Sequence, residues 1–386
     1  MQIPDYYEFL NQAKILSGNK ALEHLSFELR GHDAQKPLVI ASRAASQRGL
    51  LKPFIKAFCD STVVLGAVYD GIRDYAGISL ARDAAELFRS RGCDSIIAIG
   101  GGAVVNAAKA LNILVSEKAD SLFDFFNGAP ITKRQKPLVF VSTCEMDGLE
   151  LSGTAKVDNR MLVSELIMPT IVAIDPRMTP ICSKECAAET GAISLTLAAE
   201  AAGYGTPAPM AEAYAECALQ ILSEFMPKAV RRPGNKKAGV ALANAAVCAS
   251  IARANKPAGV ISLIAEELAK ATGHSLGTCM GVLFPFGFGY LIKKNTPFSD
   301  GLLRTIAGFD AYAATPAADR SKRGAEKAIE LHGCLKRALP ESLRALKVQR
   351  YLLSRVAEAA AAASGKRFSP NDCLTVLEHA WEGTLF

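Results

Sequence analysis

The stretch SIIAIGGGAVVNAAKALNIL, residues 95–114, decides the fold of this chain. It begins as a short apolar run with β-branched residues, passes through Gly100, Gly101 and Gly102, and continues with the composition of a helix. Glycines at such a junction let the backbone approach a ligand, and the free N–H groups that open the next helix attract an anion. The stretch lacks the spacing G-x-G-x-x-G, so a tight turn without a ligand is the alternative interpretation.

Similar apolar runs recur through the first part of the chain, separated by amphipathic stretches. The five candidate strands cover residues 36–42, 61–70, 95–101, 136–143 and 170–175. After Pro180 the chain becomes rich in Ala, Leu and Glu. The candidate helices there cover residues 183–203, 210–225, 238–254, 257–271, 300–312, 320–337, 349–364 and 370–382. The pattern predicts an α/β domain with a Rossmann-like parallel sheet over residues 1–181 and an all-helical domain over residues 182–386. A small-molecule site is expected where the two domains meet.

Composition and charge exclude several classes of protein. The chain has 386 residues and a net charge of +6, and its basic residues are scattered, which argues against nucleic-acid binding. Ten cysteines without a C-x-x-C pair indicate thiols in a reducing cytosol. The N-terminus has no signal-peptide pattern, and the apolar stretch 238–252 is too short and too rich in alanine to span a membrane. We therefore expect a cytoplasmic protein without a membrane segment.

Several motifs resemble those of the iron-containing (group III) alcohol dehydrogenases, which share the fold of dehydroquinate synthase. GGGAVVNAAK, residues 100–109, matches the family pattern GGGS-x-x-D-x-A-K, with Ala103 in place of Ser and Asn106 in place of Asp. TCEMDGLE, residues 143–150, stands where the family has T-T-A-G-T-G-S-E. Further matches lie in residues 168–179, 190–201 and 255–285. The resemblance implies this fold, a homodimer and an oxidoreductase of a small alcohol or aldehyde.

The resemblance also implies that the metal site of the family is lost. The family binds a divalent ion through one Asp and three His, and these positions hold Ile193, Leu197, Ser262 and Leu276. A further family His is replaced by Glu266. Iron or zinc needs several N, O or S donors from the protein, so we expect no bound metal.

The nucleotide site implied by the resemblance is altered as well. Backbone amides from Gly100 to Ala103 remain able to hold phosphate. Ser42 and Arg43 follow a strand where the family often has an Asp, which favours NADP slightly over NAD; a surface arginine is the alternative. The other candidate NAD(P)-binding residues are Thr143, Cys144 and Arg160. Glu145 and Asp147 would repel a pyrophosphate unless they are paired, and Arg160 is the expected compensating charge.

Without a metal ion, hydride transfer requires another acid. The candidates are His274, Glu266 and Asp147, and Glu266 would suit acid–base work if burial raised its pKa. Two alternatives to a metal-independent oxidoreductase stay open. One is a catalytically silent relative that binds a metabolite or a partner, and the other is an enzyme of a non-redox class, such as a lyase, on the same scaffold.

Overall fold

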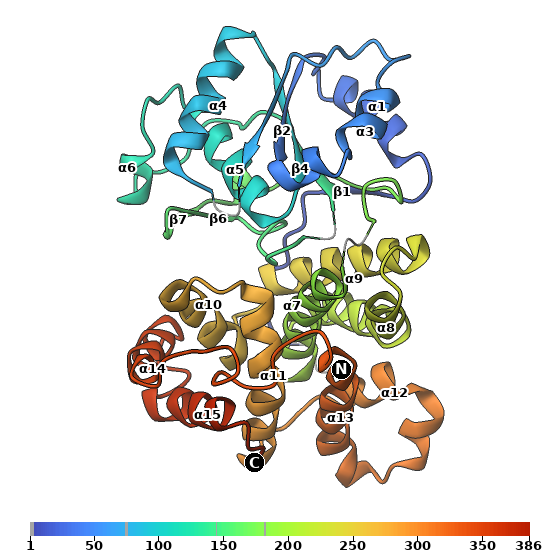
Figure 1. Ribbon diagram of the computed structural model, residues 1–386, viewed down its shortest axis with the longest axis vertical. Helices are drawn as coiled ribbons and strands as arrows, with labels where there is room; N and C mark the ends of the chain where they lie inside the picture. The colour runs from blue at the N-terminus through green and yellow to red at the C-terminus, as the bar shows by residue number, and fades with distance from the viewer. Residues whose placement is uncertain (1–3, 74–75, 144, 181–182) are drawn as a thin grey trace. The chain divides into compact units, whose positions relative to one another are not determined.

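The computed structural model describes residues 4–73, 76–143, 145–180 and 183–386, and the chain divides into two units (Figure 1). One unit is Asn11–Pro180, and the other comprises the helical part of the chain together with residues 4–10. Residues 4–10 were assigned from the sequence to the α/β part. They count with the helices because Phe9 stacks on Tyr214 and the backbone N–H of Leu10 donates to Asn255 Oδ1 across 2.6 Å.

The α/β unit is built on one sheet of six parallel strands. In the order β1-β8-β5-β4-β2-β3, these are Lys14–Ser17, Ile171–Ile174, Leu138–Ser142, Ser95–Gly100, Pro37–Ser42 and Ala67–Ile72. Four of them fall within the predicted runs, β3 overlaps the run 61–70 and extends two residues beyond it, and the predicted fold class is confirmed. β1 and the antiparallel hairpin of β6 (Thr154–Val157) and β7 (Arg160–Val163) were not predicted.

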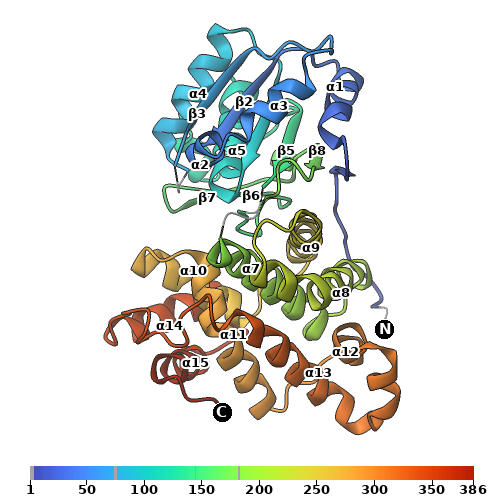
Figure 2. The ribbon, with the colours of Figure 1, turned by 45° about the vertical axis from the view of Figure 1, so that its right-hand side comes forward.

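Helices cover both faces of this sheet (Figure 2). The helices of this unit are α1 (Ala21–Gly31), α2 (Arg43–Gln47), α3 (Leu51–Ala57), α4 (Ile78–Ser90), α5 (Gly102–Ser116), α6 (Phe123–Phe126) and the 3-10 turn η1 (Glu165–Ile167). On one face Ile97 and Val139 pack with Leu25 of α1 and Phe54 of α3. The other face packs on α5, which is buried along nearly its whole length. The four inner strands β8, β5, β4 and β2 are therefore buried on both sides, as a doubly covered parallel sheet requires.

The second unit is helical throughout its regular structure. Its helices are α7 (Lys184–Gly203), α8 (Pro209–Arg231), α9 (Lys236–Ala254), α10 (Val260–Thr272), α11 (Leu276–Lys293), α12 (Asp300–Ala314), α13 (Ala317–His332), η2 (Gly333–Leu335), α14 (Leu352–Ala363) and α15 (Pro370–Glu382). α11 was absent from the predicted set. By length and composition it is the one described helix that could cross a membrane, but 67% of it is buried in the protein, as expected of a core helix.

Candidate functional site

The glycine turn lies where strand β4 passes into helix α5. Gly100 ends the strand with φ near +151°, a backbone conformation that side chains rarely allow. Gly101 caps α5, and Ala103 follows in the first turn of the helix. The predicted strand, turn and helix are therefore present. What covers the turn decides whether it can hold phosphate.

A loop of the protein itself packs on the turn. A Cβ atom built on Gly101 would lie 2.2 Å from the backbone oxygen of Glu145, and one on Gly102 would lie 2.0 Å from Asp147 Oδ2. Both distances are far inside van der Waals contact. Gly101 and Gly102 thus leave room for residues 145–147, and the carboxylate of Asp147 lies against the N-terminal turn of α5.

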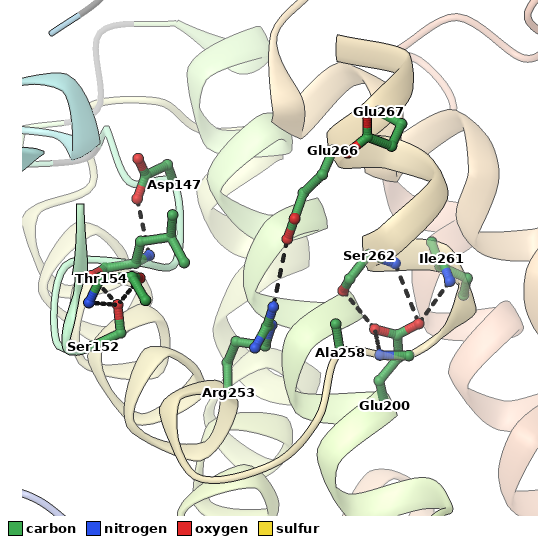
Figure 3. A network of polar contacts seen from close by, with 12 residues as sticks. Asp147, Ser152, Thr154, Glu200, Arg253, Ala258, Ile261, Ser262, Glu266 and Glu267 are labelled. Atoms are coloured by element: carbon green, nitrogen blue, oxygen red, sulfur yellow. Dashed lines mark hydrogen bonds and ion pairs between the residues drawn. The ribbon is translucent and has the colours of Figure 1, made fainter. Parts of the chain in front are cut away.

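Asp147 is held in this place by two hydrogen bonds. Its Oδ2 accepts from Asn106 Nδ2 across 3.0 Å, and its Oδ1 accepts from the backbone N–H of Leu149 across 2.9 Å. The sequence suggested Asp147 as a catalytic acid or base. The structure shows it instead as a carboxylate engaged with its own loop (Figure 3) and, through Asn106, with α5.

Two buried charged groups fix the loop further, and neither was a predicted site residue. Lys109 Nζ donates to the backbone oxygens of Leu149, Ser152 and Thr154 at 2.7, 2.8 and 2.8 Å. Burial lowers the pKa of Lys109 to about 8. One signal was available in the sequence, since Lys109 is the only charged residue of α5.

Glu150 is the second buried group, and it keeps the family residue at its position. Its two carboxylate oxygens accept from the backbone N–H groups of Asp147 and Gly148 at 2.7 and 2.9 Å. Burial, together with the nearby charge of Asp147, raises the pKa of Glu150 to about 8. Loop 145–150 is thus tied to α5 through Asn106 and Lys109 and braced internally by Glu150.

The charges near the loop are paired differently from the sequence-based expectation. Arg160, the expected compensating cation, lies with its guanidinium 4.7 Å from the ring centroid of Phe126 in α6. Arg48 is the cation that faces the loop, with its NH1 3.4 Å from Glu145 Oε1. Arg48 was missed because nothing in its local sequence distinguishes it from other surface cations.

The remaining nucleotide candidates are distributed around strands β2 and β5. Ser42 accepts a hydrogen bond from the backbone N–H of Ala45 across 3.0 Å and so caps α2, and Arg43 is exposed in the first turn of that helix. Thr143 is buried directly after β5. Cys144 lies outside the described residues.

In the helical unit, the positions where the resemblance places metal ligands are part of the packing. Ile193 and Leu197 are buried on α7, with 5% and 3% of their surface exposed. Leu276 opens α11. Ser262, on α10, donates its hydroxyl hydrogen bond to the buried carboxylate of Glu200 (Figure 3). Three of the four side chains have no donor atom, and the fourth is already engaged.

Glu200 organises this region and was not predicted as a site residue. It accepts from the backbone N–H groups of Gly259, Ile261 and Ser262 at 3.1, 2.8 and 3.3 Å, so it caps the N-terminus of α10 from α7. Burial raises its pKa, and the hydrogen bonds from α10 oppose that rise. Within the residues that the structure describes, no group of three or more His, Cys, Asp or Glu side chains is placed to hold a metal ion.

The two remaining catalytic candidates lie on α10 and just after it. Glu266 was suggested for acid–base work only if it were buried, but a third of its side chain is exposed. Its Oε1 lies 3.6 Å from Arg253 NH2. His274 is half-buried in the loop between α10 and α11. Arg253 was not a predicted site residue. Its Nε–H is buried and has no hydrogen-bond partner in the described part of the chain.

Comparison with known proteins identifies relatives over most of the chain. A family model described as iron-containing alcohol dehydrogenase matches residues 12–176. An NAD-dependent methanol dehydrogenase of Bacillus methanolicus is 23% identical over 320 residues, which cover 80% of this chain and 83% of that protein. These similarities agree with the motifs at the glycine turn and in loop 143–150.

Solved structures share the fold of the entire chain. An alcohol dehydrogenase from Oenococcus oeni matches with a TM-score of 0.85 and 18% identity, covering 97% of this chain and all of that one. A sulfoacetaldehyde reductase from Bifidobacterium kashiwanohense, solved in complex with NAD+, matches with a TM-score of 0.80 and 17% identity over 98% and 99% of the two chains. The similarity therefore extends through both units.

Proposed function

Because this chain belongs to the iron-containing alcohol dehydrogenase family, we propose that it is an oxidoreductase that interconverts a small alcohol and its aldehyde with a nicotinamide nucleotide. The observation that carries the proposal is the strand β4, glycine turn and helix α5 within a fold shared along 97% of the chain with a solved alcohol dehydrogenase. An NAD-dependent relative and a relative solved with NAD+ support a nucleotide of this type.

The residues present do not fit the divalent ion of the family. Ile193, Leu197 and Leu276 offer no donor atom, and the Ser262 hydroxyl is committed to Glu200. A divalent ion needs several strong donors from the protein. The proposed reaction is therefore metal-independent, and no step is assigned to an ion.

Protein donors would then have to act on the substrate oxygen. His274 is the proposed proton donor, as expected from the sequence. The structure adds Arg253, whose buried Nε–H has no partner among the described residues and is available to an acceptor atom. Glu266 is a positioning residue in this proposal, because it lies 3.6 Å from the guanidinium of Arg253.

The glycine turn in its present conformation does not fit a pyrophosphate, since Glu145 and Asp147 fill the space above Gly101 and Gly102. Nucleotide binding at this turn therefore requires a different position of loop 145–150. The proposed preference for NADP rests on Arg43, an exposed guanidinium in the first turn of α2, directly after β2.

The function is tested by oxidation of NADPH and NADH, followed by absorbance, with a panel of short aldehydes and the purified full-length protein. Turnover that survives exhaustive chelation is expected, with NADPH preferred. Arg43→Ser should weaken the binding of NADPH more than the binding of NADH. His274→Asn and Arg253→Met should lower kcat, and Glu266→Gln should raise KM more than it lowers kcat. Absence of turnover with every aldehyde and both nucleotides would remove the proposal.

One observation favours a second candidate, a catalytically silent relative that binds a metabolite or a partner: the glycine turn is filled by the protein's own loop. Titration of NADPH fluorescence separates the two, because the silent relative binds no nucleotide. A homodimer in the cytoplasm remains the proposed state, and sedimentation of the purified protein tests the dimer.

A further inference from the structure

We propose that Asp147 is an internal anion that competes with the nucleotide's pyrophosphate for the glycine turn, so that loop 145–150 controls access to the nucleotide site. This inference rests on the proposed function only in naming the nucleotide. It concerns the same turn and adds a residue that determines how tightly the turn binds phosphate.

The first argument is steric. A phosphate bound by backbone amides places its oxygens about 2.9 Å from the N–H nitrogens. On the side of Gly102 where a Cβ atom would stand, the carboxylate of Asp147 lies 2.0 Å from that position. On the corresponding side of Gly101, the backbone oxygen of Glu145 lies 2.2 Å from it, so the loop packs directly on the turn that a pyrophosphate would have to approach. The loop and a pyrophosphate therefore exclude each other at this turn.

The second argument is electrostatic. The N-terminus of a helix favours an anion because its first N–H groups point outward and the helix dipole adds a partial positive charge. α5 is 15 residues long, and the carboxylate of Asp147 lies at its first turn. The protein supplies its own anion at the place where relatives of this fold are expected to bind one, and a second anion beside it would be repelled.

The third argument concerns how the carboxylate is retained. By the resemblance, the family has Asp at position 106 and Thr at position 147, whereas this chain has Asn106 and Asp147. The amide of Asn106 donates to Asp147 Oδ2, a contact that an Asp at position 106 would turn into repulsion. Asn106 and Asp147, the two residues that differ from the family pattern, are thus complementary. Asn106 supplies the donor that holds the carboxylate of Asp147 at the turn.

The part of the loop that would have to move is short. Lys109 ties Leu149, Ser152 and Thr154 to α5 through three hydrogen bonds, so that end of the loop is anchored. Gly148, with φ of +85°, separates the anchored end from Asp147. Movement of residues 145–147 about Gly148 would clear the turn. The apparent affinity for nucleotide would then be the intrinsic affinity multiplied by the open fraction.

The test compares the full-length protein with Asp147→Ala, Asp147→Asn and Glu86→Ala. Glu86→Ala removes one exposed carboxylate from α4 of the same unit and is the matched charge control. Binding of inorganic pyrophosphate is measured by calorimetry, and binding of NADPH by fluorescence. Asp147→Ala should bind both at least tenfold more tightly than the unchanged protein. Asp147→Asn keeps the side-chain volume and removes the charge, so its affinities should lie between those of Asp147→Ala and of the unchanged protein. Glu86→Ala should have the affinities of the unchanged protein.

Equal affinities of the unchanged protein and both Asp147 variants would overturn the inference, and so would failure of both variants to bind pyrophosphate. Asp147→Asn keeps the test decisive if Asp147→Ala does not fold. A gain in pyrophosphate binding without any NADPH binding would support the inference and remove the proposed function. Tight NADPH binding by the unchanged protein, with no gain in the variants, would support the proposed function and overturn the inference.

Discussion

The side-chain amide of Asn106 donates a hydrogen bond to the carboxylate of Asp147 across 3.0 Å and joins helix α5 to the loop that covers the glycine turn. In the family that this chain resembles, the carboxylate belongs to the helix and the neutral residue to the loop. The pair therefore keeps one acid and one neutral partner but exchanges their positions. This exchange places negative charge on the side of the turn where a phosphate would bind.

The exchange predicts a thermodynamic coupling between the two positions. Asn106→Asp alone should destabilise the protein by about 1–3 kcal/mol, because two carboxylates would face each other and the Asp147 oxygen would lose its donor. Adding Asp147→Thr should recover most of that loss, since it restores the family arrangement. Urea unfolding of the two single variants and the double variant measures the coupling. Strictly additive effects would show that the two residues are independent.

Lys109 is predicted to stabilise the protein through its three hydrogen bonds to backbone oxygens. Lys109→Met keeps most of the apolar stem but leaves the oxygens of Leu149, Ser152 and Thr154 without this donor. We expect a loss of about 2–4 kcal/mol in the free energy of unfolding, since each lost hydrogen bond to a buried acceptor costs about 1 kcal/mol or more. The Leu149 oxygen keeps the N–H and the hydroxyl of Ser152 as donors, which limits the loss. Urea unfolding at pH 7 gives the value. Unchanged stability would mean that the loop does not depend on this anchor.

The pKa shifts of Glu150 and Lys109 predict a minimum of stability near pH 8. Folding raises the pKa of Glu150 from 4.5 to about 8. Between these two pH values the folded state therefore binds one proton more than the unfolded state, and stability falls as pH rises. Folding lowers the pKa of Lys109 from 10.5 to about 8. Above about pH 8 the unfolded state therefore binds one proton more than the folded state, and stability rises with pH. Each slope is at most about 1.4 kcal/mol per pH unit.

The pH profile is measured by thermal or urea unfolding from pH 5 to about pH 10. Glu150→Gln should flatten the falling limb, and Lys109→Met should flatten the rising limb. A profile that is the same in both variants and in the unchanged protein would show that other groups set it.

Glu200 is predicted to be a structural carboxylate of the helical unit. A Gln at this position has one acceptor oxygen in place of two, so Glu200→Gln sets an amide donor against the N–H of Gly259 or of Ile261. We expect a loss of about 2–3 kcal/mol in the free energy of unfolding and faster hydrogen exchange at the start of α10. Glu267→Gln, the same exchange at a partly exposed position of α10, is the control. Equal stability of the two variants would exclude the capping role.

The strands and most helices could be predicted from the sequence because their residues follow local rules. Apolar runs such as residues 95–101 have the pattern of strands covered on both faces, and these strands are present. α11 was missed because Pro285 and several glycines lower its helix propensity. Those glycines serve contacts distant in sequence: a Cβ on Gly287 would lie 2.2 Å from Ile261, and one on Gly281 would lie 2.3 Å from Leu339.

The candidate site could be predicted only in part, because some of its contacts also join residues that are distant in sequence. The sequence placed carboxylates near the glycine turn but could not show that Asp147 packs on Gly102, 45 residues away along the chain. It also treated Arg160 as the partner of the loop, whereas Arg160 stacks on Phe126. Contacts of this kind depend on tertiary packing, which local pattern and composition do not encode.

The proposed loss of the metal site predicts a protein that is indifferent to chelation. Purified protein should contain well below one equivalent of iron, zinc or manganese by elemental analysis, and a chelator should change neither its melting temperature nor its activity. The side chains at the family's ligand positions explain this, because Ile193, Leu197 and Leu276 cannot donate to an ion and Ser262 is bonded to Glu200.

A variant that restores the ligand set is the positive control for that measurement. Ile193→Asp combined with Leu197→His, Ser262→His and Leu276→His should bind zinc with raised thermal stability, because four donors would replace three aliphatic side chains and one hydroxyl. Restoration has a cost, since two buried aliphatic side chains on α7 become polar and Glu200 loses the Ser262 hydroxyl. Stoichiometric metal that stays with the unchanged protein through chelation would overturn the proposal that the family's metal site has been lost.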